Sequence, residues 1–319
     1  MSVNMGKVVI IGASNVGSAV LNKITDFQLA SEIALIDLDM DRVRGEALDT
    51  SHAMSSPYST NIKIHPGTYE DCRDAGFIVI TAGPSILPGE TPDRLKLAST
   101  NTKIMRSIFS EIVKYTKEAM VIMITNPLDV ATYVVSTEFD YPREKILGTG
   151  TLLETYRFRY ILAEHYSMDP KNIHGYVLGE HGNDAFVAWS TVNCAGLGIE
   201  HLDEYFHFEE KLSRHAVEQG LIRTAYDVIN LKGFTNTGIA MVACRFIKAI
   251  LFNEHTILPC SAVMEGEYGM RDVALSIPRM IAQNGIVRSL EVHLPEDELE
   301  KLTRAQKSVR AALDGAGVK

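Results

Sequence analysis

Residues 7–17 have the sequence KVVIIGASNVG, in which an apolar, β-branched run leads directly into a glycine turn. Such a run is typical of a buried parallel strand. In the turn, Gly12 allows a tight bend and Gly17 lets the following helix pack close to the strand, so that the helix N-terminus offers backbone N–H groups to a pyrophosphate. Ser14 replaces the second glycine of the fingerprint, and its side chain is small enough for a phosphate to approach. The stretch predicts the strand, turn and helix of a dinucleotide site.

A second apolar strand is expected at residues 33–38, IALIDL, after an amphipathic helix. It carries Asp37, about 20 residues beyond the last glycine of the turn, where a dinucleotide site accepts hydrogen bonds from the adenine ribose. A carboxylate there would repel a 2′-phosphate, which favours NAD over NADP. Arg42 and Arg44 follow closely and leave NADP open, and a second interpretation of Asp37 is that it only caps a turn.

The strand pattern recurs at residues 77–81 (FIVIT), 121–125 (VIMIT) and 145–147, with helical patterns between these runs. Strands that alternate with helices predict a doubly wound parallel α/β sheet, whose ligands bind beyond the carboxyl ends of the strands. Each run ends in polar or glycine residues, as expected of the edge that holds a cofactor. The residues expected to contact the cofactor are Gly12, Ser14, Asn15, Val16, Gly17, Asp37, Arg42, Thr81, Gly83, Asn126 and Thr149.

One histidine stands on a glycine-flanked turn directly after an apolar strand. Residues 177–184 are VLGEHGND, with His181 between Glu180 and Gly182. Histidine gains and loses a proton near neutral pH, which suits a general acid and base. A lone histidine is more often structural, so the chemical interpretation depends on the groups expected around it.

Two segments supply candidate partners for this histidine. Residues 84–93, PSILPGETPD, form a proline- and glycine-rich loop at the cofactor edge, and such loops often close over a substrate. Arg94 follows the loop, and closure would bring its cation over a bound ligand; the alternative is a solvated residue at a helix start. In the helix expected at residues 151–166, Glu154 and Arg157 share one face, and the planar fork of arginine matches a carboxylate. The alternative there is an ordinary surface ion pair.

Composition places the chain among globular proteins that act on small molecules. It has 319 residues, 46% of them hydrophobic and 22% charged, enough for two domains, which we place at residues 1–150 and 151–319. The net charge of −9 argues against nucleic acid or an anionic membrane as a partner. No apolar run could span a bilayer and the start lacks a secretory signal, so a cytoplasmic location is expected. Four scattered cysteines without a CxxC pair predict reduced thiols and no metal site.

Further motifs are spread along nearly the whole chain: IGASNVG, ALIDLD, TAG followed by PGET, TNPLDV, GTGTLLETYRFRY, HGYVLGEHGND, KGFTNTG and EGEYGMRDVALSIP. In order and spacing they resemble the L-lactate/malate dehydrogenase family. The resemblance implies a Rossmann domain that binds NAD, then an α+β substrate domain with antiparallel strands. It also implies reversible hydride transfer between NADH and pyruvate or related apolar 2-oxo acids, giving the L-2-hydroxy acid, in a homo-oligomer that is a tetramer or dimer.

The resemblance assigns a role to each candidate side chain. His181 would be the proton donor and acceptor, and Glu154 its carboxylate partner. The family usually has aspartate at this position; glutamate keeps the charge and adds a methylene, so we expect the pair to survive with altered geometry. Arg94 would polarise the substrate carbonyl, and Arg157 would bind the substrate carboxylate. The other substrate-binding positions implied by the resemblance are Asn126, Thr235 and Ile86.

The loop that selects the substrate departs from the usual lactate pattern. It carries two extra residues, Pro92 and Asp93, and the selecting position falls on Ile86, or on Leu87 with a shifted alignment. Neither side chain can pair with a second carboxylate, and burying that charge unpaired costs several kcal/mol, so oxaloacetate should be rejected. With Gly238 opposite, the longer loop also suits branched 2-oxo acids. An L-2-hydroxyisocaproate-type dehydrogenase is therefore the alternative; malate dehydrogenase and a non-catalytic NAD-binding protein are less favoured.

A second anion site is suggested by residues that face away from the catalytic ones. Arg159 follows Arg157 by two positions, roughly 200° around the helix, and cannot serve the same site. In bacterial members of the family that respond to fructose 1,6-bisphosphate, the positions of Arg159 and His174 bind that anion between subunits. Fructose 1,6-bisphosphate is therefore a candidate effector, and the alternative is that both residues belong to a surface or interface.

The remaining chain is expected to supply framework. We predict a strand at residues 186–192, helices at 209–231, 236–252 and 295–313, and an antiparallel meander at 256–290. The passage between the two domains is expected to run directly from strand to helix.

Overall fold

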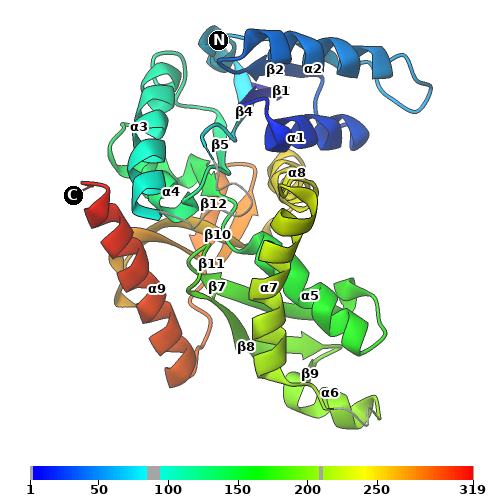
Figure 1. Cartoon of the computed structure of the whole chain (residues 1–319), viewed down its shortest axis with the longest axis vertical. Coiled ribbons are helices and arrows are strands. Elements are labelled where there is room, and N and C mark those ends of the chain that lie inside the picture. The colour runs from blue at the N-terminus through cyan, green and yellow to red at the C-terminus, as the bar shows by residue number, and fades with distance from the viewer. Residues whose placement is uncertain (1–2, 85–93, 208–210, 319) are drawn as a thin grey trace.

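The computed structural model describes residues 3–84, 94–207 and 211–318 (Figure 1). In this part of the chain, twelve strands form one sheet in the order β3-β2-β1-β4-β5-β6-β10-β11-β7-β8-β9, with β12 paired to β11. Strands β3 to β6 of this order pair in parallel, and the pairs from β6 to β9 are antiparallel. The predicted doubly wound sheet followed by an α+β part is confirmed.

The parallel part winds outward in both directions from β1. Because the order reverses between β1 and β4, the carboxyl ends of these two strands border the crevice in which such sheets bind ligands. The predicted strand at 33–38 stops earlier, since Leu38 is fully exposed, and β3 has no extended apolar run that would have predicted it. The parallel strands are β1 (Asn4–Ile11), β2 (Glu32–Ile36), β3 (Lys63–Pro66), β4 (Ala75–Ile80), β5 (Met120–Met123) and β6 (Ile146–Gly148).

Helices cover both faces of the parallel part, as alternation along β1 requires. Val8 and Ile10 point to one face and pack in a cluster with α1 and α8, whereas Val9 and Ile11 point to the other face and pack with α3 and α4. Figure 1 shows α1 and α8 side by side and α3 with α4 on the opposite side. The helices here are α1 (Asn15–Asp26), α2 (Met40–Ala53), α3 (Arg94–Ile112), α4 (Leu128–Thr137) and the short η1 (Tyr69–Arg73) and η2 (Arg143–Lys145).

The antiparallel part continues the same sheet beyond β6. Gly148 at the end of β6 pairs with Ser261 of β10, so the parallel and antiparallel parts form one continuous sheet. The predicted meander at 256–290 is present as three consecutive antiparallel strands. The strands are β7 (Ile173–Gly179), β8 (Ala185–Cys194), β9 (Leu197–Gly198), β10 (Thr256–Glu265), β11 (Arg271–Ala282) and β12 (Gly285–Ser289).

The helices of the second part begin and end where their caps allow. The helix predicted from residue 209 begins only at Arg214, because the side chain of Ser213 accepts a hydrogen bond from the Ala216 amide and caps it there. Gly233 closes the same helix in the left-handed conformation. The helices are α5 (Leu152–His165), α6 (Ile199–Tyr205), α7 (Arg214–Lys232), α8 (Thr237–Leu251), α9 (Glu296–Gly315), η3 (Pro170–Asn172) and η4 (Glu267–Gly269).

All four cysteines are buried and free, as predicted. Within the described ranges no single helix has the length and apolarity needed to cross a membrane. Only α7 and α8 taken together, with a bend of 118° between them, meet that test of length and composition.

Candidate active site

The turn after β7 carries His181 and is fixed at both ends. Strand β7 ends at Gly179, whose φ of 93° turns the chain out of the sheet. The backbone amide of His181 donates a hydrogen bond of 2.7 Å to Asp129 Oδ2. At the far end of the turn, the Asp184 carboxylate accepts hydrogen bonds from Arg304 and Ser308 of α9. The imidazole therefore sits on a short segment that is held from two helices.

Glu154 lies against the imidazole from the first turn of α5. Its Oε1 atom is 3.3 Å from His181 Nδ1 and 3.5 Å from the guanidinium of Arg157. The three side chains are only 12 to 20% exposed. The structure thus brings together the three groups that the sequence predicted as partners, with glutamate reaching the ring despite its extra methylene.

His181 and Glu154 each shift the pKa of the other toward the charged form. Burial by itself lowers the pKa of His181, but the Glu154 carboxylate more than offsets this and raises that pKa to about 9, with a further contribution from Asp129. Burial in turn raises the pKa of Glu154, yet the charge of His181 and its contact with the ring lower it below its usual value. At neutral pH the site therefore holds an imidazolium beside a carboxylate.

Asp129 is a site residue that the sequence analysis did not select. It is 3% exposed, and its Oδ1 atom accepts a hydrogen bond of 2.5 Å from Ser261 Oγ while Oδ2 accepts from His181. Burial raises the pKa of its carboxyl group to about 7. The available signal was one acidic residue in the apolar helix LDVATYVVST, because such a residue is buried only when it is hydrogen-bonded.

The glycine turn after β1 has the close packing that the sequence predicts. Gly12 has a φ of 106°, which favours glycine, and a Cβ atom on Gly17 would lie 1.8 Å from the Gly12 carbonyl oxygen. The Thr81 hydroxyl donates to the same carbonyl at 2.8 Å. Helix α1 begins at Asn15 after Ser14, so its first turn opens at the crevice.

Asp37 and Arg42 hold this turn from the side of β2. The Asp37 carboxylate accepts a hydrogen bond of 2.6 Å from the Ala13 amide, and Arg42 Nε donates to the Ala13 carbonyl at 2.8 Å. The interpretation of Asp37 as a turn cap thus describes part of its role, while its second oxygen accepts from the Asp39 amide. A carboxylate at this strand end and a turn that only glycine can fill fit the binding of NAD.

The other predicted cofactor and substrate positions lie along the same edge or close to it. Asn126 is exposed, and its carbonyl accepts a hydrogen bond of 2.5 Å from Asn101. Thr149 is buried and its hydroxyl bonds the Met123 carbonyl, so its side chain supports β5 and β6. Gly83 has a φ of 134°, and Thr235 lies half-buried just before α8. Val16 is half-buried in the first turn of α1.

Two predicted substrate contacts fall outside what the structure describes. Ile86, together with Leu87, Pro92 and Asp93, lies outside the described residues. Arg94 begins α3, but its side chain is not among those described. Their placement therefore stays a prediction from the sequence.

Comparison with protein families gives two matches that follow each other along the chain. Residues 6–148 match the lactate/malate dehydrogenase NAD binding domain, and residues 151–317 match the lactate/malate dehydrogenase alpha/beta C-terminal domain. The chain belongs to the lactate/malate dehydrogenase family. The resemblance found in the motifs is confirmed, and the protein is an oxidoreductase that uses NAD.

Relatives within the family are similar over almost the full chain. An L-lactate dehydrogenase of Selenomonas ruminantium is 74% identical over 316 residues, 99% of both chains. L-lactate dehydrogenase 2 of Clostridium acetobutylicum is 49% identical and covers 97% of both. The crystal structure of the minor L-lactate dehydrogenase from Enterococcus mundtii, in its ligands-bound form, superposes with a TM-score of 0.90 at 34% identity and covers 98% of both chains.

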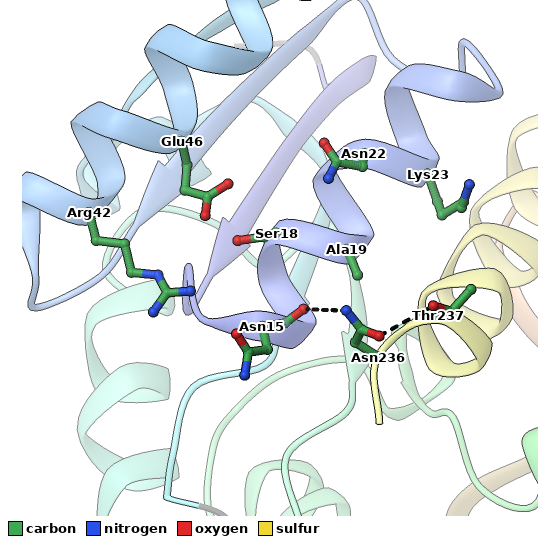
Figure 2. Close-up of a pocket in the computed structure, with 9 residues that line it drawn as sticks. All are labelled: Asn15, Ser18, Ala19, Asn22, Lys23, Arg42, Glu46, Asn236 and Thr237. Carbon is green, nitrogen blue, oxygen red and sulfur yellow. Dashed lines mark hydrogen bonds between the residues drawn. The ribbon is translucent and has the colours of Figure 1, made fainter. Parts of the chain in front are cut away.

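A pocket of about 330 Å³ lies beside the NAD-binding turn of this family member (Figure 2). Asn15 and Arg42, both predicted cofactor residues, line one end of it. The pocket then follows the outer face of α1 between α2 and the start of α8, where Asn236 donates a hydrogen bond to the Asn15 carbonyl. The remaining lining residues are Ser18, Ala19, Asn22, Lys23, Glu46 and Thr237.

One cluster of ligand-type side chains lies away from the active site. Glu32, His65 and Asp71 place ligand atoms within 4.8 Å of one another. Lys7 already brings its ammonium to 3.6 Å from Glu32, 3.2 Å from Asp71 and 2.8 Å from Asp74. Because a lysine cation neutralises these carboxylates, we interpret the cluster as a structural ion-pair network.

Arg159 and His174 flank the same short stretch of β7. The Arg159 guanidinium donates a hydrogen bond of 3.2 Å to the Gly175 carbonyl, next to the exposed His174. Burial lowers the pKa of Arg159, and its buried Nε atom has no hydrogen-bond partner among the described residues. The pair is separate from the contact between His181 and Glu154, as the helical spacing predicts.

Proposed function

We propose that the protein is an NAD-dependent L-lactate dehydrogenase, which reduces pyruvate to L-lactate with NADH and catalyses the reverse reaction. The observation that carries the proposal is the largely buried imidazole of His181, paired with Glu154 at 3.3 Å and with Arg157 beside them. The relatives named above are L-lactate dehydrogenases, and they support the same activity.

His181 would act as the general acid in pyruvate reduction. When bound, NADH supplies the hydride to the carbonyl carbon. Negative charge grows on the carbonyl oxygen, and the imidazolium stabilises this charge and then delivers its proton there. Glu154 would keep the ring oriented and would stabilise the charged form before transfer. In lactate oxidation the neutral ring would remove the hydroxyl proton.

The arginines would bind and polarise the substrate. Arg157 would hold the substrate carboxylate through its planar guanidinium, whose N–H groups match the two oxygens. Its contact with Glu154 would keep the guanidinium close to His181. Arg94 would polarise the carbonyl from the start of α3. Asn126 and Thr235 would complete the substrate pocket.

Residues 1–150 would hold NAD and residues 151–319 would carry most of the substrate site. Support comes from the narrow turn at Gly12 and Gly17 and from the Asp37 carboxylate at the end of β2. These features favour NAD over NADP, because a 2′-phosphate would meet the negative charge of Asp37.

We assign pyruvate as the substrate because the selecting position, Ile86, is apolar. None of the relatives named above supports the hydroxyisocaproate-type alternative. The test is the oxidation of NADH, followed by its absorbance, with pyruvate, 2-oxoisocaproate and oxaloacetate. We expect kcat/KM to be highest for pyruvate. If oxaloacetate gave a higher value than both other acids, the assignment would be wrong.

Four further properties are proposed from the family. We place the protein in the cytoplasm, as a homotetramer or homodimer. We also propose that it acts in glycolysis. We also propose that fructose 1,6-bisphosphate activates it at Arg159 and His174, since a half-buried arginine with an unpartnered Nε lies beside an exposed histidine. Titration of fructose 1,6-bisphosphate into a pyruvate assay at pH 7 tests this regulation, and a flat response would contradict it.

A further inference from the structure

Asp129 is the one acidic residue of α4, and the mechanism above does not use it. Its neighbours Leu128 and Val130 are buried, and the rest of the helix is apolar or uncharged. A buried carboxylate costs free energy unless hydrogen bonds compensate it. The two donors that compensate it come from distant segments, and one of them is the backbone of His181.

The hydrogen bond from His181 to Asp129 lies beyond the end of strand β7, where the chain no longer pairs with a neighbouring strand. Strand β7 ends at Gly179, which pairs with Ser276 of β11. His181 lies two residues further on, so no strand ladder fixes its amide. The hydrogen bond of 2.7 Å to Asp129 Oδ2 takes the place of a ladder bond at this position.

Ser261 fixes the other oxygen of the same carboxylate. It belongs to β10, pairs with Gly148 and Ser276 in the sheet, and is completely buried. Its hydroxyl donates to Asp129 Oδ1 at 2.5 Å. With both oxygens bound, the carboxylate cannot rotate without breaking one bond, so its position is set by the sheet itself.

The same helix start also carries Asn126, which lies three residues before Asp129. The segment at the end of β5 therefore holds the amide proposed to lie beside nicotinamide and substrate, and it also holds the backbone of the proposed proton donor. One short segment of the chain therefore contacts or carries both groups.

We propose that Asp129 is a positioning residue, whose carboxylate fixes the backbone of His181 so that the imidazole stays against Glu154 and within reach of the substrate. The inference rests on the proposed dehydrogenase function and deepens it. Glu154 orients the ring through its side chain, whereas Asp129 acts on the main chain of the same residue.

Three variants of the full-length protein test the proposal. Asp129→Ala removes both acceptors. Asp129→Asn removes the charge but keeps an oxygen that can accept from the His181 amide. It should therefore keep the His181 backbone in its place. Thr132→Val is the matched control, because Thr132 is fully buried on the same helix and its hydroxyl has no partner among the described residues.

We expect Asp129→Ala to lower kcat for pyruvate by roughly tenfold or more at pH 7, since misplacement of a general acid slows the chemical step. The Kd for NADH should stay within about twofold, because the glycine turn is untouched. Asp129→Asn should recover most of kcat, and Thr132→Val should match the parent. A folded Asp129→Ala variant with the parent kcat would overturn the proposal.

If Asp129→Ala does not fold, the double variant Asp129→Leu with Ser261→Ala replaces it. This pair fills the space with apolar atoms and leaves only the His181 amide without its acceptor, so folding is favoured. We expect the same loss of kcat. A folded double variant with the parent kcat would likewise contradict a positioning role.

A readout that needs no turnover separates this inference from the proposed function. Diethyl pyrocarbonate modifies the neutral form of imidazole, and its rate at His181 can be followed by peptide mass spectrometry. Asp129→Asn lacks the charge of Asp129, which contributes to the raised pKa of His181, but it keeps an acceptor for the His181 amide. A ring released from Glu154 would also lose the contribution of Glu154 to that pKa, so Asp129→Ala should react roughly tenfold faster or more at pH 7 than Asp129→Asn. Equal rates in Asp129→Ala and Asp129→Asn would reject positioning, whereas a parent that binds NADH without reducing pyruvate would reject only the dehydrogenase assignment.

Discussion

Glu154 Oε1 and His181 Nδ1 lie 3.3 Å apart, although one belongs to the first turn of α5 and the other to the turn after β7. The family usually has aspartate at the position of Glu154, and we expected the pair to survive with altered geometry. The longer side chain reaches the ring and also contacts Arg157 at 3.5 Å. One carboxylate thus serves both the proposed proton donor and the proposed substrate anchor.

Removal of this carboxylate should slow catalysis more than it alters folding. We expect Glu154→Ala to reduce kcat/KM for pyruvate by roughly 100-fold or more, because the imidazolium loses its partner and orientation. Glu154→Asp should recover part of the loss, since it keeps the charge on a shorter arm. Steady-state kinetics on variants with native circular dichroism measure the effect. An alanine variant with unchanged turnover would remove Glu154 from the mechanism.

The raised pKa of His181 predicts opposite pH profiles for the two directions. Reduction of pyruvate needs the imidazolium, so kcat/KM should be level near neutral pH and fall as pH rises through about 9. Oxidation of L-lactate needs the neutral ring, so its kcat/KM should rise over the same interval. In Glu154→Gln the main cause of the raised pKa is gone, and both transitions should move to lower pH. Identical profiles in parent and variant would contradict this.

Stability should follow the same pKa. A group whose pKa is raised in the folded state stabilises the fold fully below its unfolded pKa, which is about 6.5 for histidine, and loses this contribution as pH rises through the folded value. The contribution of His181 is therefore present at pH 6 and lost above about 9. Urea unfolding of the parent and Glu154→Gln at pH 6 and pH 10 should show a difference in the free energy of unfolding that shrinks at the higher pH.

Arg157 should affect substrate binding more than cofactor binding. Arg157→Lys keeps the charge but loses the planar fork, so KM for pyruvate should rise by roughly tenfold or more while Kd for NADH changes little. Arg159→Lys, two positions along the helix, is the control in the absence of fructose 1,6-bisphosphate. Equal effects of the two substitutions on KM would argue against a specific anchor at Arg157.

The glycine turn can be tested by a pair of alanine substitutions. In Gly17→Ala the new Cβ would lie 1.8 Å from the Gly12 carbonyl oxygen, so the turn must open and NADH binding should be lost. Gly45 lies in α2 with no neighbouring atom within 4 Å of a Cβ, and Gly45→Ala should stabilise the protein by about 0.5–1 kcal/mol. Fluorescence titration with NADH and thermal unfolding distinguish the two effects. Tight NADH binding by Gly17→Ala would show that the turn tolerates the side chain.

Local patterns in the sequence determined the strands, the turns and most of the helices. The run KVVIIG predicted a buried strand followed by a tight turn, because β-branched residues favour extended backbone and glycine allows a positive φ, and Gly12 has a φ of 106° in the structure. Alternation of apolar runs with helical patterns then required a doubly wound sheet. The short strand β3 was not predicted because it has no apolar run. The late start of α7 was not predicted because the capping side chain of Ser213 determines it, rather than apolar periodicity.

The sequence by itself determined which residue types the protein offers: a glycine turn for a dinucleotide, a histidine on a turn, and an acidic residue and an arginine on one helix face. The tertiary structure alone decided which of them meet. Asp129 and His181 are 52 positions apart, and Asp129 and Ser261 are 132 positions apart, yet one carboxylate joins them. Spacing along the chain fixes neighbours only within an element, whereas contacts between elements depend on how the sheet joins β6 to β10 and β11 to β7.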